Sequence, residues 1–423
     1  MHPSGYMILV SIVATSILLM LIRPRGIAEV WWISGGALLL VALRLMPLNL
    51  AWHAVAEGTD VYLFLIGMML LSELAREQGV FDWVAATAVR GARGSCSRLF
   101  LLVYGVGTLV TIFMSNDATA VVLTPAILAA VKKARVAPLP YLFVCALVAN
   151  AASFVLPISN PANLVVFHST MPPLGQWMAA FAVPSLLSIV TTYLVMRFVF
   201  RDELRKSINA EVPSSQLSAN GKLVLAGLAA MTVVLLAASA MRWDLGLPTC
   251  LAALVITAIV SIKAKSNPIE LAKEVSWGTL VLVAGLFVMV DGVEQQGALS
   301  VTQGWLHWAQ GLAPAASTMV VGFVVGIGNN VVNNLPMGLL AGATVHAAHI
   351  HGLLANAVLI GVDLGPNLSV TGSLATILWL LALRKGEVEV GFWQFLRVGA
   401  IAMPVALAAA LGGAVLMQGL IGN

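Results

Sequence analysis

The stretch Ser115-Asn116-Asp117-Ala118-Thr119 interrupts an apolar segment in the first half of the chain. A second break, Pro157-Ile158-Ser159-Asn160-Pro161-Ala162-Asn163, follows it in the same half. The second half repeats the arrangement with Val332-Asn333-Asn334-Leu335-Pro336 and then Gly361-Val362-Asp363-Leu364-Gly365-Pro366, followed by Val370-Thr371-Gly372-Ser373. Paired breaks at matching places in two apolar halves are typical of a secondary transporter with a duplicated core.

Two nearly constant offsets relate the halves. An offset of 218 aligns Gly67 with Gly285, Glu73 with Asp291, Gln78-Gly79 with Gln296-Gly297, and Asn116 with Asn334. An offset of 213 then aligns Asn150 with Asp363 and Asn160 with Ser373. The breaks therefore recur as equivalent positions of two repeats.

The composition predicts a membrane protein before any motif is used. Hydrophobic residues make up 60% of the chain, charged residues 9%, and the mean hydropathy is +0.96. A soluble domain carries about a quarter charged residues. The net charge of +4 does not indicate nucleic-acid binding, because the basic residues sit in short loops. Cys96, Cys145 and Cys250 are too far apart to suggest a disulfide framework or a zinc site.

Ten apolar runs approach the length of about 20 residues that a membrane crossing needs. They lie at 6–22, 28–46, 59–78, 140–170, 175–200, 222–241, 246–262, 275–295, 353–384 and 392–420. The runs 140–170 and 353–384 are too long for one straight crossing and predict broken helices. The stretches 98–133 and 312–346 each predict a re-entrant hairpin around an asparagine motif. The expected fold is an all-α polytopic membrane protein with about ten transmembrane helices and two re-entrant hairpins.

The polar residues 201–222 predict a cytoplasmic linker between two domains. Five spans precede this linker and five follow it, so the second half enters the membrane inverted. Residues 1–200 are the first inverted repeat, and 223–423 the second. An outside N-terminus puts 20 of the 22 Lys and Arg residues on the inner side, leaving Arg44 and Arg242 outside. Both termini are then outside. The same count allows twelve spans, but the polar tip at 115–117 favours the hairpin.

Chain breaks survive at membrane depth only where protein or water surrounds them. We expect the four breaks to meet around a small polar cavity, lined by helix ends and by amides that both donate and accept hydrogen bonds. The candidate substrate-binding residues are Ser115, Asn116, Asn150, Ser159, Asn160, Asn163, Asn333, Asn334, Thr371 and Ser373. The alternative is that these polar side chains only cap the broken helices.

Two acids lie at the breaks, and no Lys or Arg does. Burial disfavours the charged form of a carboxylate, so Asp117 and Asp363 are candidates for loading and releasing a proton. Asp363 could instead satisfy neighbouring amides. The charge pattern favours proton-coupled exchange of a small uncharged or cationic solute by alternating access. Since the sequence contains no HExxH, GxSxG or GxxxxGK[ST] motif, we predict a transporter with no catalytic residue, metal site or cofactor of its own.

These motifs resemble the arsenical pump membrane protein family, the arsenite and antimonite efflux carriers of the ion transporter superfamily. The matching pieces are Asn116-Asp117-Ala118 with Leu123-Thr124-Pro125, Asn333-Asn334-Leu335-Pro336, and residues 361–366 followed by Gly372-Ser373-Leu374-Ala375-Thr376. The resemblance implies proton-driven export of arsenite and antimonite, as neutral trihydroxides, across the inner membrane. It also implies an optional partner, a soluble arsenite-stimulated ATPase.

One segment departs from the arsenite exporters. Residues 156–163 are closer to the Asn-Pro-x-Asn pattern of the wider superfamily. This departure keeps a second function open. The chain would then be a sodium- or proton-coupled carrier of another small solute, such as a dicarboxylate, or a sodium/proton exchanger.

Overall fold

The computed structural model describes residues 3–167, 171–208, 216–297 and 299–421. Regular structure within these ranges is helical, and only an isolated bridge joins Ser95 to Ser207. Among the described residues, eight helices are long and apolar enough to cross a membrane, or nine if the bent pair α3–α4 is one span. The predicted all-α polytopic fold is confirmed.

The helix bounds follow the chain. The first half contains α1 (Pro3–Ile22), α2 (Glu29–Ala42), α3 (Leu48–Glu57), α4 (Thr59–Glu77), α5 (Val80–Gly91), α6 (Cys96–Phe113), the π-helix η2 (Ala118–Leu123), α7 (Thr124–Lys133), α8 (Leu139–Ala151), η3 (Pro157–Ser159), α9 (Pro161–Phe167), α10 (Leu174–Val199) and α11 (Arg201–Leu204). The second half contains α12 (Ala219–Ala240), α13 (Gly246–Ala264), α14 (Pro268–Glu274), α15 (Trp277–Gln295), α16 (Leu299–Gln310), α17 (Pro314–Val332), α18 (Asn334–Ala347), α19 (Leu353–Leu364), η5 (Gly365–Asn367), α20 (Leu374–Lys385) and α21 (Phe392–Ile421).

Several helices begin where the sequence supplies a cap or a proline. The Ser95 hydroxyl accepts from Arg98 N at 3.3 Å, and the Ser218 hydroxyl accepts from Gly221 N at 2.9 Å. Pro314 is at the first position of α17, where its missing N–H costs nothing. Local sequence therefore fixes these starts without tertiary contacts.

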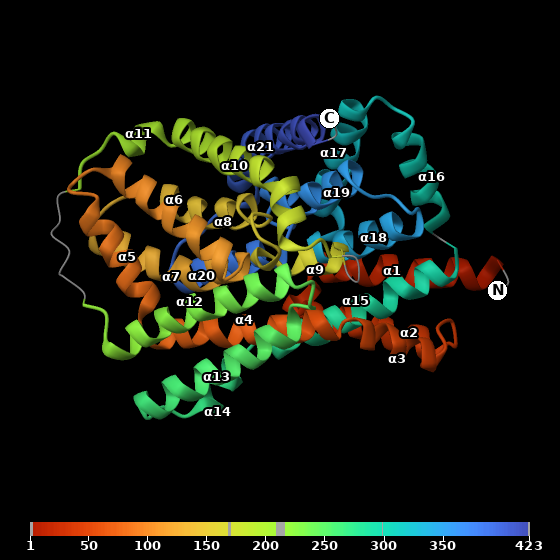
Figure 1. The fold of residues 1–423 in the computed structure, drawn as a ribbon, viewed down its shortest axis with the longest axis horizontal. Coiled ribbons are helices and arrows are strands. Elements are labelled where there is room, and N and C mark those ends of the chain that lie inside the picture. Colours follow the sequence, from red (N-terminus) through yellow and green to blue (C-terminus); the bar gives the residue numbers. More distant parts are fainter. Residues whose placement is uncertain (1–2, 168–170, 209–215, 298, 422–423) are drawn as a thin grey trace.

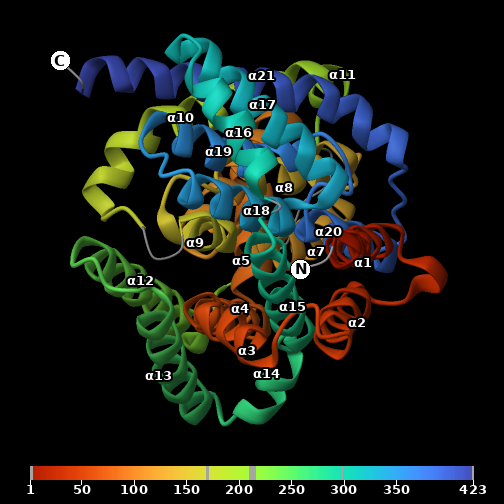
Figure 2. The same ribbon diagram turned by 90° about the vertical axis from the view of Figure 1, so that its right-hand side faces the viewer.

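The helices form two layers, seen one above the other in Figures 1 and 2. The lower layer contains α1–α4 and α12–α15, and the upper layer contains α6–α10 and α17–α21. At opposite ends of the molecule, α5 and α16 lie between the layers (Figure 1). Both layers thus combine helices from both halves of the chain.

Packing in each layer crosses between the halves. In the lower layer, α4 packs on α13 and α15 packs on α2; in the upper layer, α10 packs on α21. Glycines permit the two lower crossings: a Cβ on Gly67 would lie 2.8 Å from Thr249 O, and one on Gly285 would lie 2.9 Å from Ile33 Cγ2. Gly67 and Gly285 are equivalent under the offset of 218.

The structure differs from the sequence expectation in element lengths. The first arms of the two hairpins, α6 and α17, have 18 and 19 residues and are themselves long enough to span. Five of the described helices were not predicted: α3, α5, α11, α14 and α16. In the expected linker 201–222, α11 is helical and α12 already begins at Ala219, while 209–215 lie outside the described residues.

Candidate functional site

Two helices in each half are interrupted near the contact between the layers. The broken helices are α8–α9 and α19–α20, and the hairpins are α6 with η2–α7 and α17 with α18. The hairpin turns contain Ser115 and Asn333, equivalent under the offset of 218, and both have positive φ (153° and 76°). Asn333, with ψ 156°, occupies backbone space that favours glycine.

Four predicted binding residues cap the helices that restart after the breaks. In each case a backbone N–H just inside the helix donates to the capping side chain. The donors are Ala118 to Ser115 Oγ (3.4 Å), Ala162 to Asn160 Oδ1 (3.0 Å), Leu335 to Asn333 Oδ1 (3.5 Å) and Thr376 to Ser373 Oγ (3.1 Å). The caps form two pairs at the offsets of 218 and 213, Ser115 with Asn333 and Asn160 with Ser373. Capping is therefore one role of these residues.

Side-chain amides join the break of one half to the break of the other. Asn160 Nδ2 donates to Asp363 Oδ1 at 2.8 Å, and Asn150 Nδ2 donates to Asn367 Oδ1 at 2.9 Å. All four residues are at most 2% exposed. The two interrupted helices thus meet in one buried polar cluster.

The other predicted residues mostly fix the shape of their own break. Asn163 Nδ2 donates to the carbonyl oxygens of Ser153 (2.9 Å), Leu156 (3.3 Å) and Pro157 (3.2 Å). The Ser159 hydroxyl donates to Ile112 O of α6 at 3.0 Å, which ties the first hairpin to the first broken helix.

The second hairpin is fastened to its own broken helix in the same way. Asn333 Nδ2 donates to Thr371 O at 3.3 Å, and the Thr371 hydroxyl donates to Asn330 O at 3.0 Å.

Several buried oxygens accept no hydrogen bond from the described part of the protein. Among the predicted residues these are Oδ1 of Asn116, Asn150, Asn163 and Asn334, and Oδ2 of Asp363. Ser153 lies beside the Asp363 carboxylate, but its hydroxyl donates to Asn150 O at 2.7 Å. Because an unsatisfied buried acceptor costs about 1–3 kcal/mol, these oxygens are where a polar solute or a proton would be stabilised.

Asp117 differs from Asp363. It is half-buried at the start of η2, whereas Asp363 is fully buried. Within the described ranges, no hydrogen bond or ion pair connects Asp117 to Asp363 or to the second half. The structure therefore brings Asp363, but not Asp117, into the cluster that joins the two broken helices.

The sequence analysis did not predict four residues that bond at the breaks, namely Asn329, Asn330, Asn367 and Ser369. Asn329 Nδ2 donates to Gly361 O (2.8 Å) and Val362 O (2.9 Å). Asn330 Oδ1 accepts from both the amide and the hydroxyl of Ser369 (3.1 and 2.8 Å). Asn367 is the partner of Asn150. A signal was present, because Asn329 and Asn330 are two more amides within four residues of the Asn333-Asn334 break.

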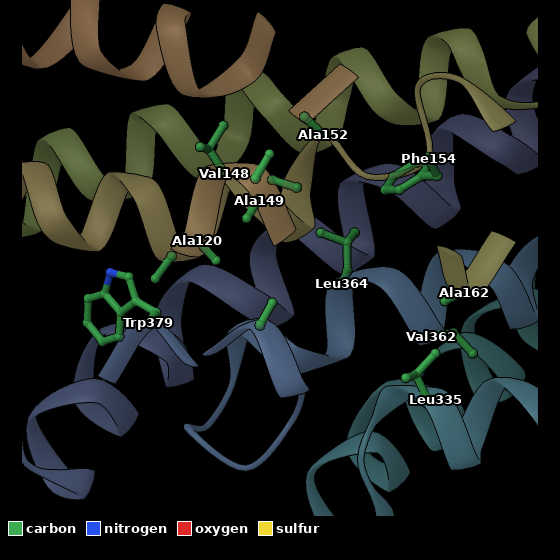
Figure 3. Close-up of a cluster of buried hydrophobic side chains, with 14 of the residues drawn as sticks. Ala120, Val148, Ala149, Ala152, Phe154, Ala162, Leu335, Val362, Leu364 and Trp379 are labelled. Atoms are coloured by element: carbon green, nitrogen blue, oxygen red, sulfur yellow. The ribbon is translucent and has the colours of Figure 1, made fainter. Parts of the chain in front are cut away.

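A cavity of about 870 Å³ lies beside α9, α15 and α18. Val165 and Val166 of α9 and Leu339 of α18 line it, and the residues of the Asn160–Asp363 cluster do not. Ala162 and Leu335, close to these residues in the sequence, lie together with Val362 in an apolar contact (Figure 3).

Comparison with known proteins identifies the family of the chain. A family model described as citrate transporter, CitMHS, matches residues 8–362. The chain belongs to this citrate transporter family. Its relatives include arsenical pump membrane proteins of Escherichia coli (strain K12), 24% identical over 413 residues covering 92% of this chain and 94% of the relative, and of Yersinia enterocolitica, 25% identical over 408 residues with the same coverage.

The fold of this family member also occurs among solved structures. The crystal structure of the Alcanivorax borkumensis YdaH transporter, described as having an unusual topology, matches with a TM-score of 0.57 at 16% identity, covering 99% of this chain and 98% of that one. The predicted resemblance to the arsenical pumps is confirmed, and the chain is a multi-pass membrane transporter.

Proposed function

We propose that this family member exports trivalent arsenite and antimonite from the cytoplasm in exchange for protons. The observation that carries the proposal is the buried Asn160–Asp363 pair, which joins the two broken helices through a carboxylate with one oxygen free of protein donors. The names of the arsenical pump relatives support the substrate. Amides and one carboxylate suit a neutral trihydroxide, whereas a tricarboxylate would need cations in the cluster.

Asp363 is the proposed proton carrier. A proton on Oδ2 would neutralise the carboxylate while Oδ1 keeps the hydrogen bond from Asn160. Loss of that proton leaves a charge in a buried site, where it attracts hydroxyl donors of the solute. Asp117, half-buried in the first hairpin, would act nearer the path by which protons reach the cluster.

The two halves would work as inverted repeats across the inner membrane, with both termini outside. Support comes from equivalent caps, equivalent positive-φ turns, and the crossed packing of α4 on α13 and α2 on α15. Alternating access then moves the hairpins and broken helices of the upper layer relative to the lower layer. Asn116 and Asn334, equivalent under the offset of 218, each offer a buried acceptor for the solute.

Arsenite accumulation in everted proteoliposomes of the purified chain tests the proposal. With an acidic lumen, we expect uptake that an uncoupler abolishes. Replacing sodium by choline should leave this uptake unchanged. Failure of the gradient to drive uptake would reject a proton exchanger, and dependence on sodium would favour the alternative, a sodium-coupled carrier of another solute. Uptake only with a soluble ATPase added would assign the energy source to that partner.

An Asp363→Asn variant separates coupling from binding. Asn keeps an acceptor for Asn160 but carries no titrating proton, so gradient-driven accumulation should fall to the level seen with uncoupler. Arsenite exchange between compartments at equal pH should persist. Asp117→Asn is the matched control, and we expect it to slow accumulation without abolishing it. Normal gradient-driven accumulation by Asp363→Asn would remove Asp363 from the mechanism.

A further inference from the structure

Each broken helix has one buried polar residue at the end of its first part. Asn150 is the second-last residue of α8, and Asp363 is the second-last residue of α19. The two positions are equivalent under the offset of 213. Asn150 is 1% exposed and Asp363 is 0% exposed. The same point of the two breaks therefore carries an amide in the first half and a carboxyl in the second.

Both positions face an asparagine of the other half. Asn160 Nδ2 donates to Asp363 Oδ1 at 2.8 Å, and Asn150 Nδ2 donates to Asn367 Oδ1 at 2.9 Å. At each position one oxygen has no donor in the described part of the protein, namely Oδ2 of Asp363 and Oδ1 of Asn150. The two positions thus have the same kind of surroundings, an amide of the opposite half and one free acceptor.

The two positions belong to one connected cluster. The Ser153 hydroxyl donates to Asn150 O at 2.7 Å, and Ser153 also lies beside the Asp363 carboxylate. In addition, α8 packs on α19 and on η5, which contains Asn367. A proton bound at either position would therefore act on the same set of side chains.

Asp363 is the ionisable member of this cluster, and its side-chain partners within the described residues are neutral. Of the helices packed against α19, α9 and α17 carry no ionisable side chain. The other ionisable groups on these helices point elsewhere: His346 of α18 lines the cavity of about 870 Å³, Arg397 of α21 is exposed, and Tyr141 of α8 donates to a carbonyl oxygen of α6. Cys145 of α8 forms no hydrogen bond with the cluster in the described structure.

We propose that the chain exchanges one proton per solute, and that Asn150 fixes this number by filling the second proton position with a neutral amide. The inference rests on the proposed proton exchange. Asp117 is not counted, because it lies outside the cluster and has Leu335 at its equivalent position under the offset of 218.

The chemistry of the two side chains supports this assignment. An amide has nearly the shape of a protonated carboxyl and also combines a donor with an acceptor, but it does not titrate near neutral pH. Asn367 is an amide as Asn160 is, so it can turn its NH2 group toward a carboxylate at position 150, as Asn160 does toward Asp363. A carboxyl should therefore carry the proton from either position.

The arsenite gradient at equilibrium tests the number of protons. In proteoliposomes without a membrane potential, a difference of one pH unit balances an arsenite gradient of about tenfold if one proton is exchanged, because each proton then contributes about 1.4 kcal/mol. Two protons balance a gradient of about a hundredfold. We expect the tenfold gradient for wild type, the hundredfold gradient for Asn150→Asp, and no gradient for Asp363→Asn.

An exchange of the two residues tests the equivalence of the positions. Asp363→Asn combined with Asn150→Asp keeps the composition and the charge of the cluster, and it should restore the gradient that Asp363→Asn alone abolishes. The matched control is Asp363→Asn combined with Asn367→Asp. It puts a carboxyl on the other side of the same hydrogen bond, at a position that is not equivalent to Asp363, and it should restore nothing.

The inference and the proposed function fail in different ways. A hundredfold gradient in wild type, a tenfold gradient in Asn150→Asp, no rescue by the exchanged pair, or equal rescue by the control each overturns the inference while proton-driven export of arsenite stands. The wild-type result requires no variant to fold. If wild type moves no arsenite, the proposed function fails, and infrared difference spectra between acidic and neutral pH, recorded without solute, test the proton position. A carboxyl band that is lost in Asp363→Asn should then return in the exchanged pair, and its absence there overturns the inference.

Discussion

At the scale of single residues, the site uses asparagine for two tasks that a sequence cannot separate. Asn160 and Asn333 cap the restarting helices and also donate across a break. Asn116 and Asn334 keep free acceptors instead. Asn at the start of a helix can either cap that helix or contact a solute. Only its hydrogen-bond partners in the structure show which of the two roles it has.

Asn333 allows the two tasks to be tested separately. Replacing it with Ala removes the cap and should lower the free energy of unfolding by about 1 kcal/mol. Replacing it with Gly removes the same cap and the same hydrogen bond to Thr371 O, but Gly adopts φ 76° readily, so the loss should be smaller than in Asn333→Ala. Thermal melting in detergent measures both.

Transport by the two variants gives the second readout. If Asn333 contacts the solute, apparent affinity weakens in both variants. If capping is its only role, Asn333→Gly transports like wild type, and Asn333 leaves the set of binding residues. A melting temperature of Asn333→Gly well below that of Asn333→Ala would contradict the expectation that Gly adopts the backbone conformation of this position more readily than Ala.

The sequence located the breaks because polar residues in apolar runs are conspicuous, and offsets of 218 and 213 matched them. It did not locate Asn329, Asn330 or Asn367 as parts of the cluster. Their partners lie in other helices, as with Asn329 and Gly361 O or Asn367 and Asn150. Such pairings follow from how the helices cross, which local patterns do not encode.

At the scale of helices, the contact between α9 and α18 depends on small residues. Gly338 and Gly342 of α18 face α9, and small residues at this spacing let helix backbones approach closely. A Cβ on Gly342 would lie 2.7 Å from Val166 O and 3.0 Å from Val166 Cα. The neighbour is backbone, so it cannot turn aside as a side chain would.

We expect Gly342→Ala to destabilise the protein. The better helix propensity of Ala contributes up to about 1 kcal/mol, but overpacking against a fixed backbone costs about 1–3 kcal/mol and outweighs it. Gly304→Ala in α16 is the matched control, because no heavy atom lies within 4 Å of its added Cβ. Melting temperatures should move in opposite directions for the two variants. A stabilised Gly342→Ala would show that α9 and α18 separate easily.

Element lengths were predicted less well than element types. The predicted re-entrant hairpins have two short helices each. In the structure the first helices, α6 and α17, are long and continue to Phe113 and Val332, next to the turns. The unpredicted α5 and α16 contain polar and aromatic residues. Each packs on the second arm of a hairpin, α5 on α7 and α16 on α18. Hydropathy alone does not mark such amphipathic helices.

At the scale of the whole molecule, the lower layer depends on two equivalent crossings. Gly67 meets the backbone of Thr249 at 2.8 Å, while the atom nearest to Gly285 is the Cγ2 methyl of Ile33 and the Ile33 backbone lies 3.4 Å away. We therefore expect Gly67→Ala to cost about 1–3 kcal/mol and Gly285→Ala to cost less, since its closest backbone neighbour leaves more room. Gly105→Ala in α6, with no atom within 4 Å, is the control for helix propensity.

Thermal melting of the three variants in one detergent checks the order. Gly67→Ala should melt lowest, Gly285→Ala in between, and Gly105→Ala at or above wild type. Equal melting of Gly67→Ala and Gly105→Ala would mean that α4 and α13 are not held at the described distance.

The crossed packing of the halves also constrains the order of synthesis. A ribosome that has completed residues 1–200 has delivered α4 without α13, α2 without α15, and α10 without α21. Neither layer can close at that stage, and the nascent helices must stay in the lipid with their small-residue faces uncovered. The upper layer therefore stays incomplete until α21 has been made. A premature stop before the end of α15 leaves both layers incomplete, and a stop between α15 and α21 leaves the upper layer incomplete.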